Sequence, residues 1–125
     1  MSAPTRAYAR ATQETASRER LMILLFEAAL RHMRHASTLL EEGQPEALTA
    51  LTKASDIVAE LAATLDAQKA PELARTLGEL YAFVAERLAH AAVFKKASAA
   101  REAERAFAPI VEGFQQAVTS LQAKP

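Results

Sequence analysis

The chain has no cysteine and no tryptophan, and its 125 residues include only three glycines, five prolines and 6% aromatic residues. The absence of cysteine excludes a disulfide framework, thiol chemistry and a thiolate metal site. The first 20 residues contain four arginines and no apolar core. Because that pattern differs from both a secretory signal and a membrane span, we expect a cytosolic protein with no membrane insertion.

Alanine and other apolar residues make up much of what is present. Half of the residues are apolar, a composition typical of a helical bundle when glycine and proline are scarce. Capping and breaking residues predict helices over residues 17–42, 45–65, 71–92 and from about 105 to 121. Short connections imply antiparallel neighbours. We therefore expect an all-α fold, an antiparallel up-and-down four-helix bundle over residues 17–125 with an N-terminal extension at residues 1–16.

Three residues indicate where the predicted helices begin, end or bend. Ser17, followed by an acidic residue in the first turn, predicts the N-cap of the first helix. Gly43 predicts its end, because glycine suits the position after a helix C-terminus. Pro109 lies inside the last apolar pattern, on the side opposite Phe107. An interior proline costs about 3 kcal/mol or more, so we expect a kink or a new helix start there.

The sequence offers little for catalysis or metal binding. His32 and His35 lie one helical turn apart, but no third ligand stands at a matching spacing, and the paired Glu-x-x-His motifs of a di-iron bundle are missing. A buried, hydrogen-bonded His32 is the better interpretation. Glu86 and His90 predict a solvated pair, and the surroundings of His32 lack the lysine and glycine of a histidine phosphotransfer site. We expect no enzymatic activity, no cofactor and no metal.

The charge pattern also bears on partners. The net charge is zero, with positive ends and an acidic middle that suggest complementary helices within one bundle. No basic patch of the kind that neutralises phosphates is present. We therefore expect no nucleic-acid partner.

Helix-spaced small residues are the most informative feature of the third predicted helix. Gly78, Ala82, Ala85 and Ala89 follow offsets of four, three and four, and so share one stripe. A stripe with almost no side chains allows another backbone to approach closely. The stripe predicts either close packing between the protein's own helices or a surface that receives a partner helix. Its larger neighbours, which resemble an ordinary core, are Leu73, Leu77, Leu80, Val84 and Leu88.

Two further features favour a partner. Apolar residues cover well over half of the first predicted helix, whereas a surface helix needs an apolar arc of about 100° or somewhat more. This helix is therefore either central to the bundle or partly exposed to a partner. Phe83 lies on the polar side of the third predicted helix. Together with the small-residue stripe, this excess of apolar surface predicts the binding of an amphipathic helix.

Several motifs, in order and in register, resemble those of the flagellin-export chaperones, the FliS family. The matching pieces are Ala7-Tyr8, residues 14–17 followed by Leu21 and Leu24-Leu25-Phe26-Glu27, residues 57–66, and residues 72–81 followed by Leu88. The chain departs from the family at Phe26, where tyrosine is usual, and in lacking a tryptophan near its end.

The resemblance implies a four-helix chaperone that binds the disordered C-terminal segment of flagellin, prevents its premature polymerisation and aids its delivery to the flagellar type III export gate. In the family, the N-terminal segment with its tyrosine can cover part of the binding surface. Tyr8 is therefore expected to act as a cover. The expected client-binding residues are Leu21, Leu24, Leu25, Phe26, Leu77, Gly78, Tyr81, Ala82, Ala85 and Ala89. For the leucines and Tyr81 the alternative is a place in the protein's own core, and for Tyr8 it is a flexible tail.

Other functions remain open on the sequence. The chain could be a helical self-association module, or a divergent chaperone of another secretion system. A phosphotransfer or metal-binding bundle is a third alternative. Without its client, a chaperone of this kind is expected to be a monomer or a weak homodimer.

Overall fold

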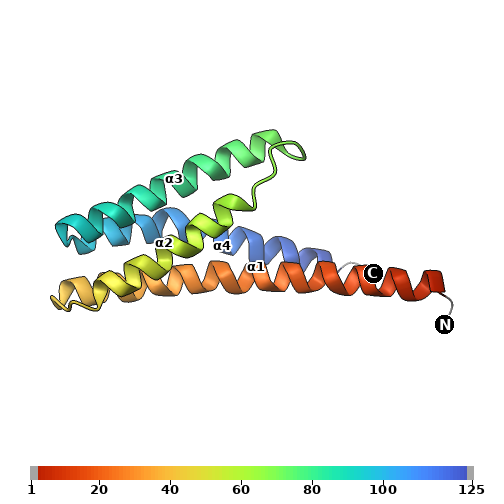
Figure 1. Cartoon of the computed structure of the whole chain (residues 1–125), viewed down its shortest axis with the longest axis horizontal. Coiled ribbons are helices and arrows are strands. Elements are labelled where there is room, and N and C mark those ends of the chain that lie inside the picture. The colour runs from red at the N-terminus through yellow and green to blue at the C-terminus, as the bar shows by residue number, and fades with distance from the viewer. Residues whose placement is uncertain (1–2, 124–125) are drawn as a thin grey trace.

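The computed structural model describes the backbone of residues 3–123, and the side chains of Arg6, Arg10 and residues 17–120. Four helices make up nearly all of it (Figure 1): α1 (Ala3–Glu41), α2 (Ala47–Ala63), α3 (Pro71–Phe94) and α4 (Ala97–Ala123). The described residues form no strand. The all-α prediction is confirmed.

The helices follow one another around the bundle in chain order. α1 packs against α2 and α4, and α3 packs against the same two helices. α1 and α3 are therefore diagonal partners. Since each connection joins two packed helices through only a few residues, successive helices run antiparallel. The predicted up-and-down four-helix bundle is confirmed.

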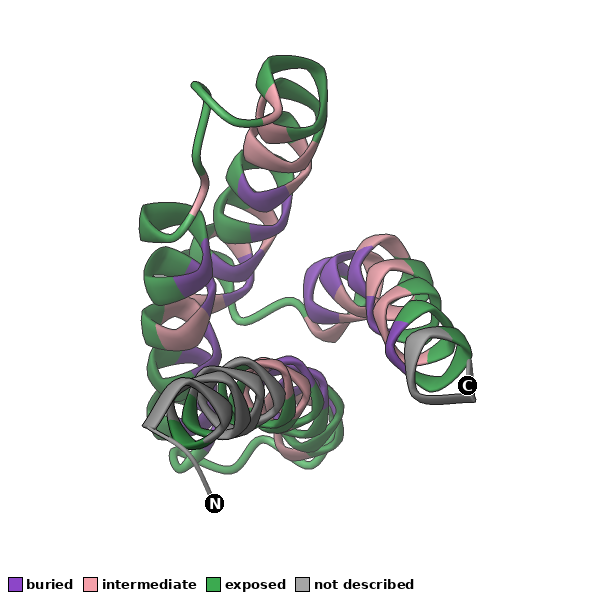
Figure 2. Ribbon diagram, turned by 90° about the vertical axis from the view of Figure 1, so that its right-hand side faces the viewer, coloured by how far each residue is buried: buried purple, intermediate pink, exposed green. Residues whose placement is uncertain are grey.

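Aromatic rings hold the centre of the core. Phe107 is fully buried and lies 5.8 Å from Phe26 and 6.5 Å from Tyr81 between ring centroids. Phe114 lies 5.1 Å from Phe26. All of these rings are tilted relative to one another, an arrangement that aromatic pairs favour. Aliphatic residues and alanines from all four helices complete the core, and Figure 2 shows the buried positions along the inner sides of the helices.

The first helix begins at Ala3 and not at Ser17. Ser17 lies inside the helix, so its predicted role as an N-cap is wrong. Residues 3–16 are polar, yet they contain five alanines and no proline after Pro4, and polar helix formers such as arginine, glutamine and glutamate do not interrupt a helix. The N-terminal extension is thus continuous with α1, and in Figure 1 this part of α1 projects beyond the other helices.

The last helix also begins earlier than predicted, at Ala97 and not near residue 105. Ala99, Ala100 and Ala103 are buried, so the inward face of α4 starts within a stretch whose small side chains and many charges resemble a loop. Pro109 does not start a new helix, since α4 continues through it. Its exposed position agrees with the predicted outward orientation.

Gly43 and Lys95 mark the two turns at one end of the bundle. Gly43 follows α1 with a φ of +68°, as its predicted role requires. Lys95 ends α3 with φ 53° and ψ 47°, a left-handed conformation that is uncommon outside glycine and asparagine.

Charged pairs join the helices on the outside. Arg34 of α1 donates to Glu104 of α4 at 2.8 Å, and Arg101 of α4 pairs with Glu41 of α1. Arg87 of α3 lies 3.7 Å from Glu102 of α4. Of these three pairs, Arg101–Glu41 joins a positive end of the chain to its acidic middle, as the charge pattern predicts, whereas the other two do not follow that pattern. Within the described residues, no helix combines the length and the apolarity needed to cross a bilayer.

Candidate partner-binding surface

The inward stripe of α3 is covered at one end and open at the other. Val84 and Leu88 are 0% and 1% exposed, whereas Leu73, on the same stripe, is 58% exposed. Leu77 and Leu80, between them, are half-buried. The expectation that all five leucine and valine residues form an ordinary core is therefore wrong for Leu73. The beginning of α3 presents core-type side chains that the protein itself does not cover.

The arrangement of the helices explains this gradient. In Figure 1 the connection between α2 and α3 stands away from α1 and α4, while the opposite ends of the helices converge. We call the end at the α2–α3 connection the open end and the other the closed end. At the open end the start of α3 lacks close neighbours, so its apolar stripe meets solvent.

The small-residue stripe of α3 is also open. Ala82, Ala85 and Ala89 are exposed and Gly78 is half-buried. Along most of its length, the small-residue stripe therefore does not pack closely against another helix of the protein. Its side of α3 is the one toward α2. A Cβ built on Gly78 would lie 3.7 Å from Leu65, in the α2–α3 connection.

Exposed apolar residues of α1 lie near the same end of the molecule. Leu21 and Leu24 are 56% and 57% exposed, and Leu25 is half-buried. Because α1 and α3 are diagonal in the bundle, these residues and the α3 stripe do not form one compact patch. A single partner can reach both groups only as an extended chain.

Two of the sequence-predicted site residues belong to the core. Phe26 and Tyr81 are 4% and 3% exposed and contact the central ring of Phe107. Burial also raises the pKa of the Tyr81 hydroxyl above its ordinary value, because ionisation in an apolar surrounding is unfavourable. Both side chains are closed to a partner in this structure. The backbone of Tyr8 lies in α1, and its side chain is outside the described side chains.

Of the two polar pairs singled out in the sequence, the one that contains His32 differs from the prediction. His32 is partly exposed and not buried. Desolvation lowers its pKa, and the nearby positive charges of Arg31 and Lys53 add to that effect. Glu86 accepts two hydrogen bonds of 2.6 Å from Arg87, while the ring of His90 lies 4.6 Å from that of Phe94. Among the described residues, no three potential metal ligands come together.

Sequence reasoning missed several exposed apolar residues. Leu73 was assigned to the core, and Leu48, Val93 and Phe94 were not considered, although they are 58%, 71% and 59% exposed. The helical spacing of Leu73 matches that of buried residues, so only the position of neighbouring helices distinguishes it. Val93 lies four residues after Ala89 and continues the small-residue stripe of α3, so its helical spacing could have indicated it. Phe83 is 46% exposed, as predicted.

Comparison with known proteins bears on what this surface binds. The model of a protein family described as "Flagellar protein FliS" matches residues 1–121. A curated relative, the flagellar secretion chaperone FliS of Salmonella typhimurium (strain LT2), is 35% identical over 117 residues, which cover 89% of this chain and 87% of the relative. The match therefore extends over all four helices and includes the N-terminal part of α1.

Proposed function

The chain belongs to the FliS family of flagellar proteins, and we propose that it is a flagellar secretion chaperone that binds the disordered C-terminal segment of flagellin. Binding would prevent premature polymerisation of flagellin and aid its delivery to the export gate of the flagellar type III system. The chaperone would act in the cytosol, by binding and not by catalysis.

The observation that carries this proposal is the uncovered inward stripe at the start of α3. Leu73 is 58% exposed on the stripe that buries Val84 completely. Solvent exposure of a leucine is common on protein surfaces, but here the helix lacks a neighbour on its core side. A helical segment of a client would supply that neighbour.

The chemistry of a disordered client suits an extended apolar surface. A disordered segment loses conformational entropy when it orders, so the interface must bury a large area to offset that loss. Burial of apolar area contributes about 25 cal/mol per Å². A client segment that contacts both α3 and the distant leucines of α1 buries more apolar area than a segment held in a single pocket, and so offsets more of the lost conformational entropy. The exposed members of the proposed surface are Leu21, Leu24, Ala82, Ala85 and Ala89, with Leu25, Leu77 and Gly78 half-buried.

The small residues of α3 suit a helical segment of the client. Ala82, Ala85 and Ala89 are exposed in succession on one side of the helix. A client helix crossing them can bring its backbone close to α3, because no large side chain stands between the two. Larger apolar residues of the client would then contact Leu77 and Leu73 at the open end.

Titration calorimetry with the C-terminal segment of the flagellin from the same organism tests the proposal. We expect a saturable complex of one chaperone to one segment, and a scrambled segment of the same composition should not bind. An absence of binding by a folded protein would reject the proposal. If light scattering then showed a dimer that survives dilution, a self-association module would be the better function.

The proposed cover is tested by the same titration. If the N-terminal segment competes with the client through Tyr8, the Tyr8→Ala variant should bind the flagellin segment more tightly than the unaltered protein. In the structure residues 3–16 continue α1, so covering the surface would require this segment to leave the helix. An unchanged affinity in the variant would remove Tyr8 from the proposal.

A further inference from the structure

Residues that weaken a helix are placed unevenly in this bundle. Gly78 lies in the first half of α3, and Pro109 and Gly113 lie at and beyond the middle of α4. In the described helices no other glycine is present, and every other proline lies in a first turn. Sharp bends of helices occur mostly at proline and glycine. The points of easy bending therefore lie in the two helix segments that lead to the open end.

No close neighbour requires the two helical glycines. A Cβ at Gly113 would meet no atom within 4 Å, and one at Gly78 would meet Leu65 Cδ1 at 3.7 Å, an ordinary contact. Only Gly43, in the α1–α2 turn, has a positive φ among the glycines. Inside a helix, a glycine costs about 1 kcal/mol relative to alanine, and a proline such as Pro109 costs about 3 kcal/mol or more. The chain thus gives up helix stability at these positions, and what it gains there is easier bending.

The bending points lie just beyond the ring contact that joins α3 to α4. The rings of Tyr81 and Phe107 are buried, with their centroids 6.5 Å apart. Because the two helices are antiparallel, residues before Tyr81 face residues after Phe107. Gly78 is three residues before Tyr81, and Pro109 is two residues after Phe107. Both helices can therefore bend at the same level, where the packed core ends and the open end begins.

The segments beyond this level carry apolar side chains that complement each other. On α3, Leu77 is half-buried and Leu73 is 58% exposed, and on α4, Phe114 is half-buried. Leu73 precedes Tyr81 by eight residues and Phe114 follows Phe107 by seven, which is about two helical turns in each case. If the two segments approached each other, Leu73 and Phe114 would meet. The protein would then cover its own exposed leucine.

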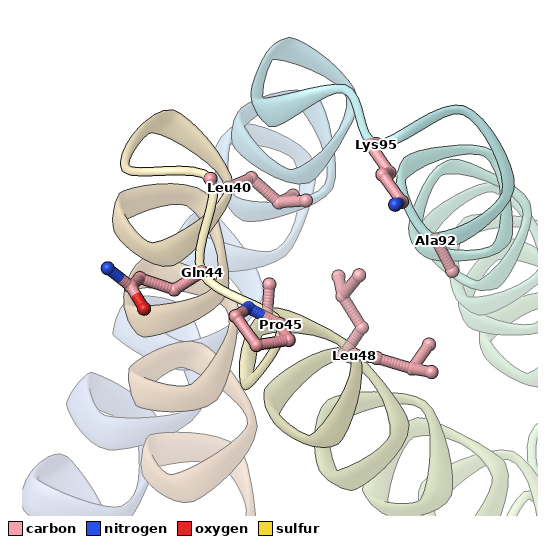
Figure 3. A pocket seen from close by; sticks show the side chains of 9 residues that line it. Leu40, Gln44, Pro45, Leu48, Ala92 and Lys95 are labelled. Atoms are coloured by element: carbon pink, nitrogen blue, oxygen red, sulfur yellow. The ribbon is translucent and has the colours of Figure 1, made fainter.

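The closed end lacks this combination. A pocket of about 300 Å³ lies there between the α1–α2 turn, α2 and the end of α3, and its lining includes Leu40, Leu48 and Ala92 (Figure 3). The parts of α3 and α4 that meet at this end, residues 79–94 and 97–108, contain neither glycine nor proline. The helices at the closed end are therefore stiff, and bending is confined to the open end.

We propose that the open end is a hinged clamp. In the free protein, the beginning of α3 and the end of α4 bend toward one another, at Gly78 in one helix and at Pro109 and Gly113 in the other, until Leu73 contacts Phe114. The open and closed arrangements are alternative states of the same chain, because packed helices change between discrete arrangements. Closure is a property of the free chain and does not depend on flagellin being the client.

Electron–electron double resonance between two spin labels tests the proposal. Because the chain has no cysteine, Glu72→Cys and Thr119→Cys place labels only at two exposed positions, one on each arm of the clamp. We expect two distances in the free protein that differ by a few ångströms, since a kink of about 20° in each helix moves the labels by that much. A second pair, Thr49→Cys with Ser98→Cys, lies at the closed end and should give one distance.

A variant with stiffened helices separates bending from a general loss of structure. Gly78→Ala, Pro109→Ala and Gly113→Ala, combined in one chain, should leave only the longer distance, because alanine favours the helix at each position. Gly78→Ala alone should already reduce the share of the shorter distance. Thr52→Ala is the matched control, since it favours the helix at an exposed position of α2, and it should keep both distances.

Four results would overturn the clamp. These are a single distance in the unaltered chain, a shorter distance that keeps its share in the stiffened variant, two distances for the closed-end pair, and loss of the shorter distance in Thr52→Ala. The last result would assign closure to overall stability and not to the hinge.

The clamp also has a consequence for the client, and this part rests on the proposed function. A client that needs the open state binds with an apparent affinity lowered by the closed fraction. The stiffened variant should therefore bind the flagellin segment more tightly than the unaltered chain. If both bind equally, closure does not compete with the client. If neither binds, the proposed function fails, whereas the label distances still decide whether the clamp exists.

Discussion

At the scale of single residues, the exposure of a side chain distinguishes the core of this bundle from its binding surface. Phe107 and Phe83 are the same residue type on adjacent helices, yet one is 0% and the other 46% exposed. Tyr81 matched the family motif in the sequence and Phe26 stands where the family usually has tyrosine, but both rings pack around Phe107. A match to a family motif therefore does not tell whether a residue contacts the partner itself or belongs to the core that supports the partner-binding helix.

Replacing Phe107 tests the assignment of the core. Phe107→Ala should lower the free energy of unfolding by about 3–5 kcal/mol, since it removes a fully buried ring and leaves a cavity. Phe83→Ala is the matched control and should change stability by less than about 1 kcal/mol. Urea denaturation measures both. Equal losses in the two variants would contradict the central position of Phe107.

The two helical glycines test whether the α3 stripe has space for a side chain. Gly78→Ala and Gly113→Ala should each stabilise the protein by about 0.5–1 kcal/mol, because alanine restricts the unfolded chain and favours the helix. The nearest atom to a Cβ at Gly78 is Leu65 Cδ1 at 3.7 Å, an ordinary contact, and nothing lies within 4 Å at Gly113. Thermal unfolding measures the change. A loss of stability in Gly78→Ala alone would show that the stripe is more tightly packed than described.

At the scale of helices, α3 has two apolar faces and the bundle covers only one of them in part. The face toward the core is buried at Val84 and Leu88 and exposed at Leu73. The small-residue face toward α2 is exposed at Ala82, Ala85 and Ala89. A helix with this much uncovered apolar surface is suited to receive another helix.

A large side chain on the small-residue face tests that role. Ala82→Trp should leave the fold intact, because Ala82 is exposed, and should weaken binding of the flagellin segment by tenfold or more by occupying the space of the client helix. Gln116→Trp, on an exposed side of α4, is the control for a surface tryptophan. Calorimetry gives the affinities. If both variants bind like the unaltered protein, the stripe lies outside the client interface.

Helix boundaries show what the sequence could and could not predict at this scale. Gly43 and Pro71 define the end of α1 and the start of α3 as predicted, because glycine and proline restrict the backbone strongly. The starts of α1 and α4 were wrong. Residues 3–16 and 97–105 lack a large apolar pattern, but their alanines favour the helix, and in α4 Ala99, Ala100 and Ala103 form the buried face.

At the scale of the whole molecule, the bundle is closed at one end and open at the other. The number and order of the helices followed from the sequence, since short connections allow few arrangements of four helices. The opening at the start of α3 could not be predicted, because the apolar spacing of Leu73, Leu77 and Leu80 is the same as that of covered residues. Only the distance to α1 and α4 determines whether such a stripe is core or interface.

The central claim is that a client covers the apolar surface that this bundle leaves open, and methyl NMR of the leucine side chains tests it most directly. On addition of the flagellin C-terminal segment, the methyl groups of Leu21, Leu24, Leu73 and Leu77 should shift and reach saturation together. Those of Leu40 and Leu51, at the closed end, should remain unchanged. Shifts confined to the closed end, or no shifts with a folded protein, would contradict the account.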